Sequence, residues 1–203
     1  MFEIISINEL LKRLDKYNHT SLHIHHTYSP NHSDWKRKPD ALYWQESMRN
    51  YHVKTRKFQD IAQHVTLLPT GEFVTGRDFA IDPASITGYN QGAFCVEIFG
   101  NFDLGKDKFE SKQKESALKL ARYFDDKKKY VRFHRENSPK TCPGTSIDKV
   151  KFMEEVRSMD YEKALVVLAV TVGIDGSYWF HRKNIDPYFD ELIIKIAKYL
   201  KKG

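Results

Sequence analysis

The sequence predicts an α/β domain with a mixed central β-sheet and helices on both faces, followed by a small C-terminal helical segment. Strand-like segments alternate with longer amphipathic segments over residues 1–159. One segment, AFCVEIFG at 93–100, is nearly all apolar, as expected of a central strand buried on both faces. Beyond about residue 159 the pattern changes to two helices.

Apolar spacing and turn residues place the elements of the main domain. The first helix is predicted because four apolar residues share one face, and a hairpin is predicted because the turn sequence PTG separates two apolar runs. A Thr145/Asp148 capping pattern opens the last helix of this domain. In chain order we expect a helix at 7–17, a strand at 21–27, a polar loop at 31–40, a helix at 41–53, a hairpin of 62–68 and 72–78, the central strand, a helix at 111–126, an edge strand at 130–134 and a helix at 145–159.

The C-terminal segment, 160–203, is predicted to contain helices at 161–173 and 186–203 around residues 174–184. The last helix is expected to bury one face, formed by Phe189, Leu192, Ile193, Ile196 and Leu200. A piece of this size is marginal by itself. We therefore expect it to pack on the main domain or to form a homodimer.

The composition limits the classes of partner that we expect this chain to bind. The 203 residues carry a formal charge of +6, but their basic residues are scattered among 27 acidic ones, and the one tight run is Lys127–Lys129. A nucleic-acid binder usually shows a denser basic stripe, so no nucleic-acid partner is expected. No stretch has the roughly 18 apolar residues of a membrane span, and no signal peptide is visible. We expect synthesis in the cytosol and no membrane partner.

The residues best suited to chemistry are histidines and a cysteine. Side chains alternate along a strand, so His23 and His25 share one face while His26 lies on the other with the apolar residues. His26 is predicted to be a hydrogen-bonded core histidine. His134 and Cys142, eight residues apart, can converge from a strand end and a loop.

Two imidazoles and a thiolate suit zinc, and three protein ligands leave the open position of a catalytic site. Two other interpretations stay open from spacing alone. A buried thiol and a surface histidine need no metal, and the same donor set occurs in blue-copper sites. A copper site would need an axial ligand near the cysteine, whereas Met153 lies eleven residues beyond Cys142 in a predicted helix. The cysteines, Cys95 and Cys142, cannot form a disulfide framework.

Several segments, in order, resemble one family: IHHT, FQDIAQHVTLLPTGEFVTGRD, GYN, VEIFGNFD and FHRENSPKTCPG. They are similar to the zinc-dependent N-acetylmuramoyl-L-alanine amidases, the type-2 amidase and peptidoglycan-recognition family. The resemblance runs from about residue 20 to about residue 156 and is strongest to phage and prophage endolysins of Gram-positive bacteria. It implies that Zn²⁺ is bound by His25, His134 and Cys142.

The resemblance also implies a catalytic lysine, Lys140, which would stabilise the oxyanion. A general base is still needed. Some family members use a tyrosine where this chain has Gln63, and others use a glutamate in the central strand, which here is Glu97. Glu97 is therefore expected to be the base. The alternative is a structural carboxylate bonded to the backbone or to an arginine such as Arg77.

Three further residues match family positions near the groove and are expected to bind substrate: Thr27, Asn90 and Arg77. Thr27 and Asn90 could instead close turns, and Arg77 could be structural. The implied reaction is hydrolysis of the amide between N-acetylmuramic acid and L-alanine in peptidoglycan. We expect an endolysin that acts on the cell wall after release during lysis, with residues 160–203 binding the wall or forming a dimer. The alternatives are a cytosolic amidase that recycles muropeptides and a non-catalytic peptidoglycan-binding module.

Overall fold

A six-stranded mixed sheet forms the centre of the larger of two compact units. The computed structural model describes residues 1–158, 161–173 and 187–201, and the chain divides into units Met1–Val156 and Arg157–Gly203. The strand order is β1-β4-β3-β5-β2-β6. The strands are β1 (Ile4–Ile5), β2 (Ser21–His26), β3 (Val65–Leu67), β4 (Phe73–Thr75), β5 (Ala93–Ile98) and β6 (Tyr130–Phe133).

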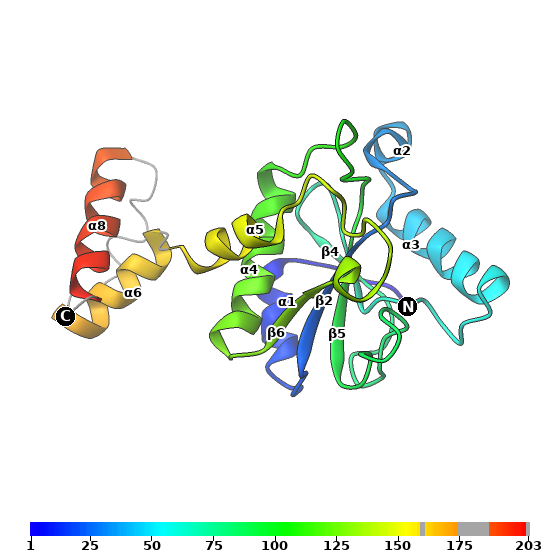
Figure 1. The fold of residues 1–203 in the computed structure, drawn as a ribbon, viewed down its shortest axis with the longest axis horizontal. Helices are drawn as coiled ribbons and strands as arrows, with labels where there is room; N and C mark the ends of the chain where they lie inside the picture. The colour runs from blue at the N-terminus through cyan, green and yellow to red at the C-terminus, as the bar shows by residue number, and fades with distance from the viewer. Residues whose placement is uncertain (159–160, 174–186, 202–203) are drawn as a thin grey trace. The chain divides into compact units, whose positions relative to one another are not determined.

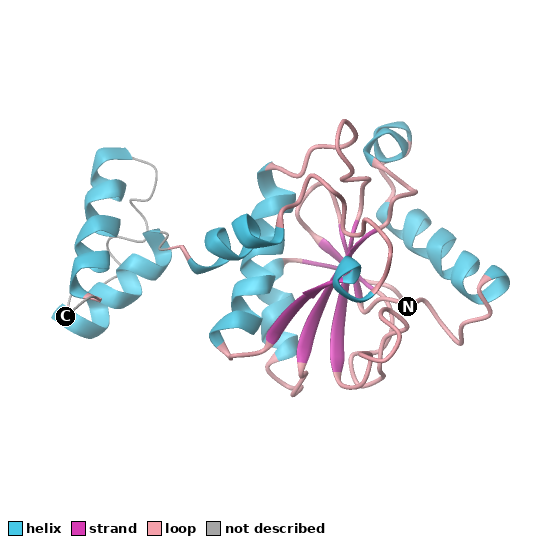
Figure 2. Ribbon diagram, viewed as in Figure 1, coloured by secondary structure: helices cyan, strands magenta, loops and turns pink. Residues whose placement is uncertain are grey.

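Helices cover both faces of this sheet, which confirms the predicted fold class (Figures 1 and 2). On one face α4 contacts α1 and strands β2, β3 and β6, while α3 contacts β4. The helices of this unit are α1 (Ile7–Leu14), α2 (His32–Arg37), α3 (Ala41–Asn50), α4 (Ser111–Asp126) and α5 (Lys149–Arg157, ending one residue beyond the unit); a π-helical turn η1 (Tyr51–Thr55) and a 3₁₀ turn η2 (His134–Asn137) follow α3 and β6.

The central strands run parallel. β5 pairs in parallel with β2 on one side and β3 on the other, and β2 pairs in parallel with β6. The carboxyl ends of β2, β5 and β6 therefore meet at one edge of the sheet. The predicted β3–β4 hairpin, the buried central strand β5, the edge strand β6 and the exact span of helix α4 are all found.

The core lies between the sheet and helices α1, α4 and α5. It includes Leu10, Leu14, Leu22, Ile24, Phe94, Val96, Leu120, Phe133 and Phe152, each at most 3% exposed. The alternation expected for β2 is visible here, because Leu22 and Ile24 enter this core. The histidines between them belong to the opposite face, where the site lies.

Two predictions for this unit were wrong. The segment 31–40 is not all loop, because a capping box begins helix α2: Asn31 Oδ1 accepts from the Ser33 and Asp34 N–H groups, and Asp34 accepts from the Asn31 N–H. Helix α5 begins at Lys149, with Asp148 accepting from the Lys151 N–H. Thr145 lies before the helix and accepts from the Leu104 N–H instead.

The second unit contains α6 (Tyr161–Val172) and α8 (Pro187–Leu200), which pack against each other. The expected buried face of the last helix needs correction. Ile193 and Ala197 are buried, whereas Leu192 and Ile196 are 51% and 40% exposed. Residues 174–184, which we placed between the two helices, lie outside the described residues. None of the described helices combines the length and apolar content that a membrane span needs.

Leu120 provides a test of the core. It is fully buried on α4. Leu120→Ala should lower the free energy of unfolding by about 2–5 kcal/mol, because it removes buried methyl groups and leaves a cavity. Denaturant unfolding measures the change, with the exposed Glu115→Ala on the same helix as the control. A loss below about 1 kcal/mol for Leu120→Ala would contradict this packing.

Candidate metal centre

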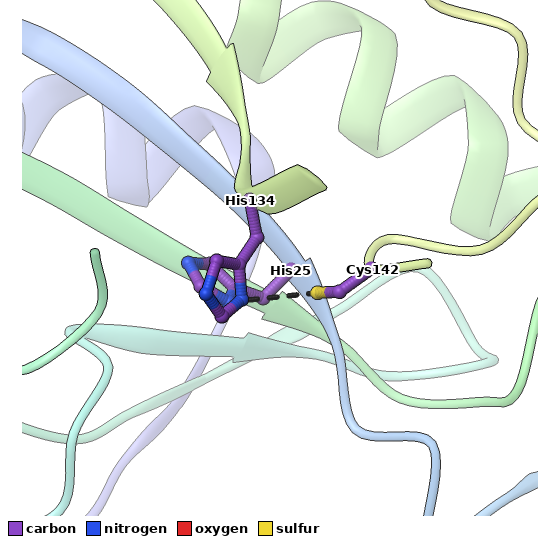
Figure 3. Close-up of side chains that lie close together, drawn as sticks. All are labelled: His25, His134 and Cys142. Atoms are coloured by element: carbon purple, nitrogen blue, oxygen red, sulfur yellow. Dashed lines mark hydrogen bonds between the residues drawn. The ribbon is translucent and has the colours of Figure 1, made fainter. Parts of the chain in front are cut away.

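Three side chains from distant parts of the sequence converge at the carboxyl ends of the parallel strands. His25 is on β2, His134 is the first residue after β6, and Cys142 lies in the loop before α5 (Figure 3). One possible ligand atom from each of the three lies within 4.8 Å of the others. This is the set expected from the sequence, and the chain brings it together without His23 or His26.

The distances fit a tetrahedral zinc ion. Cys142 Sγ is 3.6 Å from His25 Nδ1, and the two imidazole rings have centroids 4.4 Å apart. With Zn–S near 2.3 Å and Zn–N near 2.0–2.1 Å, sulfur and nitrogen ligands of one ion are about 3.6 Å apart. His25 Nε2 is buried and has no hydrogen-bond partner in the described part of the chain. The donor set and its spacing therefore fit Zn²⁺.

Burial sets the charges of these groups. Desolvation lowers the pKa of His25 well below its ordinary value and also lowers the pKa of His134, helped in both cases by neighbouring positive groups including Lys140. Both imidazoles are thus neutral, the form that binds a metal. Desolvation raises the pKa of the Cys142 thiol to about 12. A divalent cation would reverse that shift by favouring the thiolate.

The loop that carries Cys142 is fixed by Arg135. The Arg135 N–H donates to the Cys142 carbonyl at 2.9 Å, and its guanidinium donates to the carbonyls of Gly144 and Ile147. Gly144 has φ +118°, and a Cβ there would lie 2.4 Å from the Phe102 backbone, so glycine is required. The Cys142 sulfur accepts from the His26 N–H at 3.4 Å. The sulfur is therefore held toward His25.

Glu97 lies beside this cluster because β5 pairs with β2 in a register that sets it opposite His25. Its side chain lines the pockets on both sides of the centre and has no hydrogen bond or ion pair to any described residue. Desolvation raises the pKa of Glu97 to about 7, and the positive charge of Lys140 opposes the rise. The alternative in which Glu97 is a structural carboxylate bonded to Arg77 is not observed, because the described Arg77 guanidinium donates to backbone carbonyls instead.

The family is settled by comparison with known sequences. The family described as N-acetylmuramoyl-L-alanine amidase (Amidase_2) matches residues 15–145. The chain belongs to this amidase family. The match includes His25, His134 and Cys142, and it ends before α5 and the second unit. No curated protein sequence matches the chain.

Solved structures share the amidase fold. N-acetylmuramoyl-L-alanine amidase LysC from Clostridium intestinale URNW is 22% identical, with a TM-score of 0.55 and coverage of 69% of this chain and 86% of that one. The endolysine amidase LysCS from the same organism is 21% identical, with a TM-score of 0.55 and coverage of 75% and 87%. Drosophila PGRP-LB is 20% identical, with a TM-score of 0.52 and coverage of 71% and 79%.

The other residues expected at the amidase site have different surroundings. Lys140 is exposed and lines the pockets on both sides of the centre. Thr27 and Asn90 each line one pocket, but both also hold loops. Thr27 Oγ1 accepts from the Gly100 N–H and donates to the Pro30 carbonyl, and Asn90 Oδ1 accepts from the N–H groups of Ser85 and Ile86.

Arg77 is 8% exposed, and its guanidinium donates to the carbonyls of Asp60, Ile61 and Asp82. It braces the loops beside the sheet and is not among the residues that line the pockets at the centre. The histidines left out of the cluster are also bonded. His26 Nδ1 accepts from the Phe102 N–H, as expected of a core histidine, and His23 Nδ1 is 2.7 Å from Ser85 Oγ.

His52 is a groove residue that the sequence did not reveal. It lies on the π-helical turn η1 and lines the pockets on both sides of the centre, together with Arg56. His52 Nδ1 accepts from the Ala62 N–H at 3.2 Å, and burial lowers the pKa of His52 to about 4. The neutral ring therefore carries its proton on Nε2. We predicted one regular helix over 41–53, and that prediction did not place His52 at the groove. The π-helical turn changes which residues face the groove.

The two cysteines give a matched test of the metal centre. Cys142→Ser should abolish stoichiometric zinc binding near neutral pH, because a hydroxyl is a far weaker ligand than a thiolate. Cys95→Ser is the control, since Cys95 is buried on β5 outside the cluster. Zinc content after dialysis against a weak chelator measures the difference. Equal zinc content in the two variants would contradict the assignment.

Glu97 gives a test by pH. Its pKa is about 7 in the fold against 4.5 for an ordinary glutamate, so ionisation of Glu97 destabilises the metal-free fold as pH rises from about 4.5 to about 7. Glu97→Gln should therefore raise the thermal midpoint of the chelated protein at pH 8 and leave it unchanged at pH 4. Glu115→Gln, on the exposed side of α4, is the control. A gain that is equal at both pH values would contradict the desolvation of Glu97.

Proposed function

We propose that this amidase-family chain uses Zn²⁺ to hydrolyse the amide between N-acetylmuramic acid and L-alanine in peptidoglycan. The observation that carries the proposal is the complete His25, His134 and Cys142 set at the meeting point of two pockets. Both pockets are also lined by Glu97 and Lys140. A substrate that lies along both pockets would have its reacting amide beside a metal, a carboxylate and an ammonium group.

The chain's own residues supply the proton transfers and much of the electrostatics. Zinc bound by the three ligands would polarise the substrate carbonyl and lower the pKa of water. The Glu97 carboxylate, opposite His25 in the sheet, accepts a proton from the attacking water and returns it to the leaving amine. The Lys140 ammonium stabilises the negative charge that develops on the carbonyl oxygen. Neutral His52 offers an N–H donor that orients the substrate in the groove.

A lytic role as an endolysin, released from the cytosol during lysis, is part of this proposal. It is supported by the likeness to an endolysine amidase from C. intestinale. The peptidoglycan-recognition neighbour keeps a binding module as the alternative. The full ligand set with Glu97 beside it favours an enzyme. A wall-binding or dimer-forming role of residues 160–203 stays a prediction.

Cell-wall digestion tests the reaction itself. Purified peptidoglycan incubated with the zinc-loaded protein should release new amino groups on L-alanine, and a chelator should stop the release. His25→Ala should be inactive because one ligand is lost. Binding to peptidoglycan without new amino groups would contradict the amidase and support the recognition module.

Lys140 tests the electrostatic step. Lys140→Gln should lower kcat by about 100- to 1000-fold, the usual effect of removing one oxyanion stabiliser. Its zinc content should stay unchanged, because Lys140 is not in the ligand set. Lys128→Gln is the control, since Lys128 lies in the turn before β6, at the other end of that strand from His134. Full activity of Lys140→Gln would contradict the assigned role.

A further inference from the structure

The two pockets that meet at the metal centre have different linings. His25, Glu97 and His134 line both of them. In the proposed reaction the cleaved amide joins a glycan to a peptide. A substrate whose amide lies at the centre therefore places its glycan in one pocket and its peptide in the other. The side chains of each pocket indicate which part of the substrate it binds.

The pocket that reaches Asn90 suits a peptide. It is lined by the carboxamides of Asn90 and Asn137 and by the small apolar side chains of Ala62 and Ala84. The two carboxamide oxygens accept hydrogen bonds within the protein, whereas no described residue accepts from the two NH₂ groups. These NH₂ groups can donate to the carbonyls of a bound peptide. The small apolar side chains leave room for the methyl group of an alanine.

The other pocket, which we call the aromatic pocket, is lined by Tyr28 and Trp44, and neither of these lines the peptide pocket. Tyr28 is 58% exposed, Trp44 is half-buried, and the exposed hydroxyl residues Ser29 and Ser47 lie in the same lining. A pyranose ring has an apolar face of C–H groups and a rim of hydroxyls. Aromatic rings with hydroxyl groups beside them match both features, because the rings bury the apolar face and the hydroxyls exchange hydrogen bonds with the rim.

Tyr28 has a backbone conformation that is costly for a tyrosine. Its φ is +60°, a left-handed region that glycine and asparagine adopt more readily than bulky residues do. The Tyr28 N–H donates to the Gly100 carbonyl at 2.9 Å, which holds the backbone there. Among the described rings, only that of His26 packs against Tyr28, edge-on with centroids 6.0 Å apart. A strained, exposed side chain that packs this little is expected to act on a ligand.

We propose that the aromatic pocket binds the glycan and that the Tyr28 ring stacks on one of its pyranose rings. This inference rests on the proposed amidase function. Tyr28 follows the ligand His25 by three residues, so the two Cα atoms are at most about 11 Å apart. The stacked sugar is therefore the one that carries the cleaved amide or the next one along the glycan strand. The enzyme thus selects a peptide that is attached to a glycan over the same peptide on a lactyl group alone.

A matched pair of soluble substrates with the same peptide tests this proposal. In one the lactyl group belongs to a muramyl disaccharide, and in the other it carries no sugar. The wild-type enzyme should cleave the disaccharide substrate with a kcat/KM about tenfold higher, a typical effect of stacking on one aromatic ring. Tyr28→Asn should remove most of this preference, mainly through a higher KM for the disaccharide substrate. Tyr28→Phe should keep it, because the ring remains.

Asparagine also separates binding from folding. Because it adopts φ +60° more readily than tyrosine, Tyr28→Asn should not lower the thermal midpoint. The control is Lys128→Asn, since Lys128 is exposed and also has φ +60° but lies in the turn before β6. This control should keep the wild-type kcat/KM for both substrates. A lower thermal midpoint of Tyr28→Asn, together with an equal loss on both substrates, would show that the ring only supports the fold.

The outcomes separate this inference from the amidase proposal. Equal kcat/KM of the wild type for both substrates would overturn the glycan pocket while the amidase stands. If the wild type cleaves neither substrate, the amidase proposal fails, and calorimetry with the peptide-free muramyl disaccharide decides the inference by itself. Weaker binding of this disaccharide to Tyr28→Asn than to the wild type would then support the pocket, and equal binding would overturn it.

Discussion

The parallel pairing of β2 with β5 and β6 is the constraint on which the site depends. It sets His25 opposite Glu97 and brings the end of β6, with His134, to the same edge. A slip of one residue in β2 would turn the His25 side chain into the core, away from His134 and Cys142. The core contacts of Leu22 and Ile24 therefore fix the metal centre as well as the sheet.

Polar groups that have hydrogen-bond partners and buried polar groups that lack them play different roles in this molecule. The guanidiniums of Arg135 and Arg77 donate to several backbone carbonyls, so they hold loops in place. Glu97 and His25 Nε2 lack such partners among the described residues, and both residues line the groove. Groups desolvated without partners are expensive to keep. Their position on one face is consistent with selection for binding and chemistry.

Much of the fold and the ligand set was predictable, because both follow local rules. Alternation along β2 separated His25 from His26, and an unbroken apolar run identified β5. Other features depend on tertiary contacts that no local pattern encodes. The carbonyls that accept from Arg77 belong to two loops that only the fold brings together, at Asp60–Ile61 and at Asp82. The π-helical turn that brings His52 to the groove interrupts an otherwise regular helical pattern. The two residues of the capping box, Asn31 and Asp34, can be recognised in the sequence. We interpreted 31–40 as a loop because nearly all of the segment is polar.

X-ray absorption at the zinc edge of the zinc-loaded protein tests the central claim most directly. The account predicts one sulfur at about 2.3 Å and two imidazole nitrogens at about 2.0–2.1 Å, with one further light-atom ligand from solvent. Loss of the sulfur signal in Cys142→Ser would assign it. A spectrum of zinc with nitrogen and oxygen ligands alone, or with two sulfurs, would contradict the assembly of His25, His134 and Cys142 around one ion.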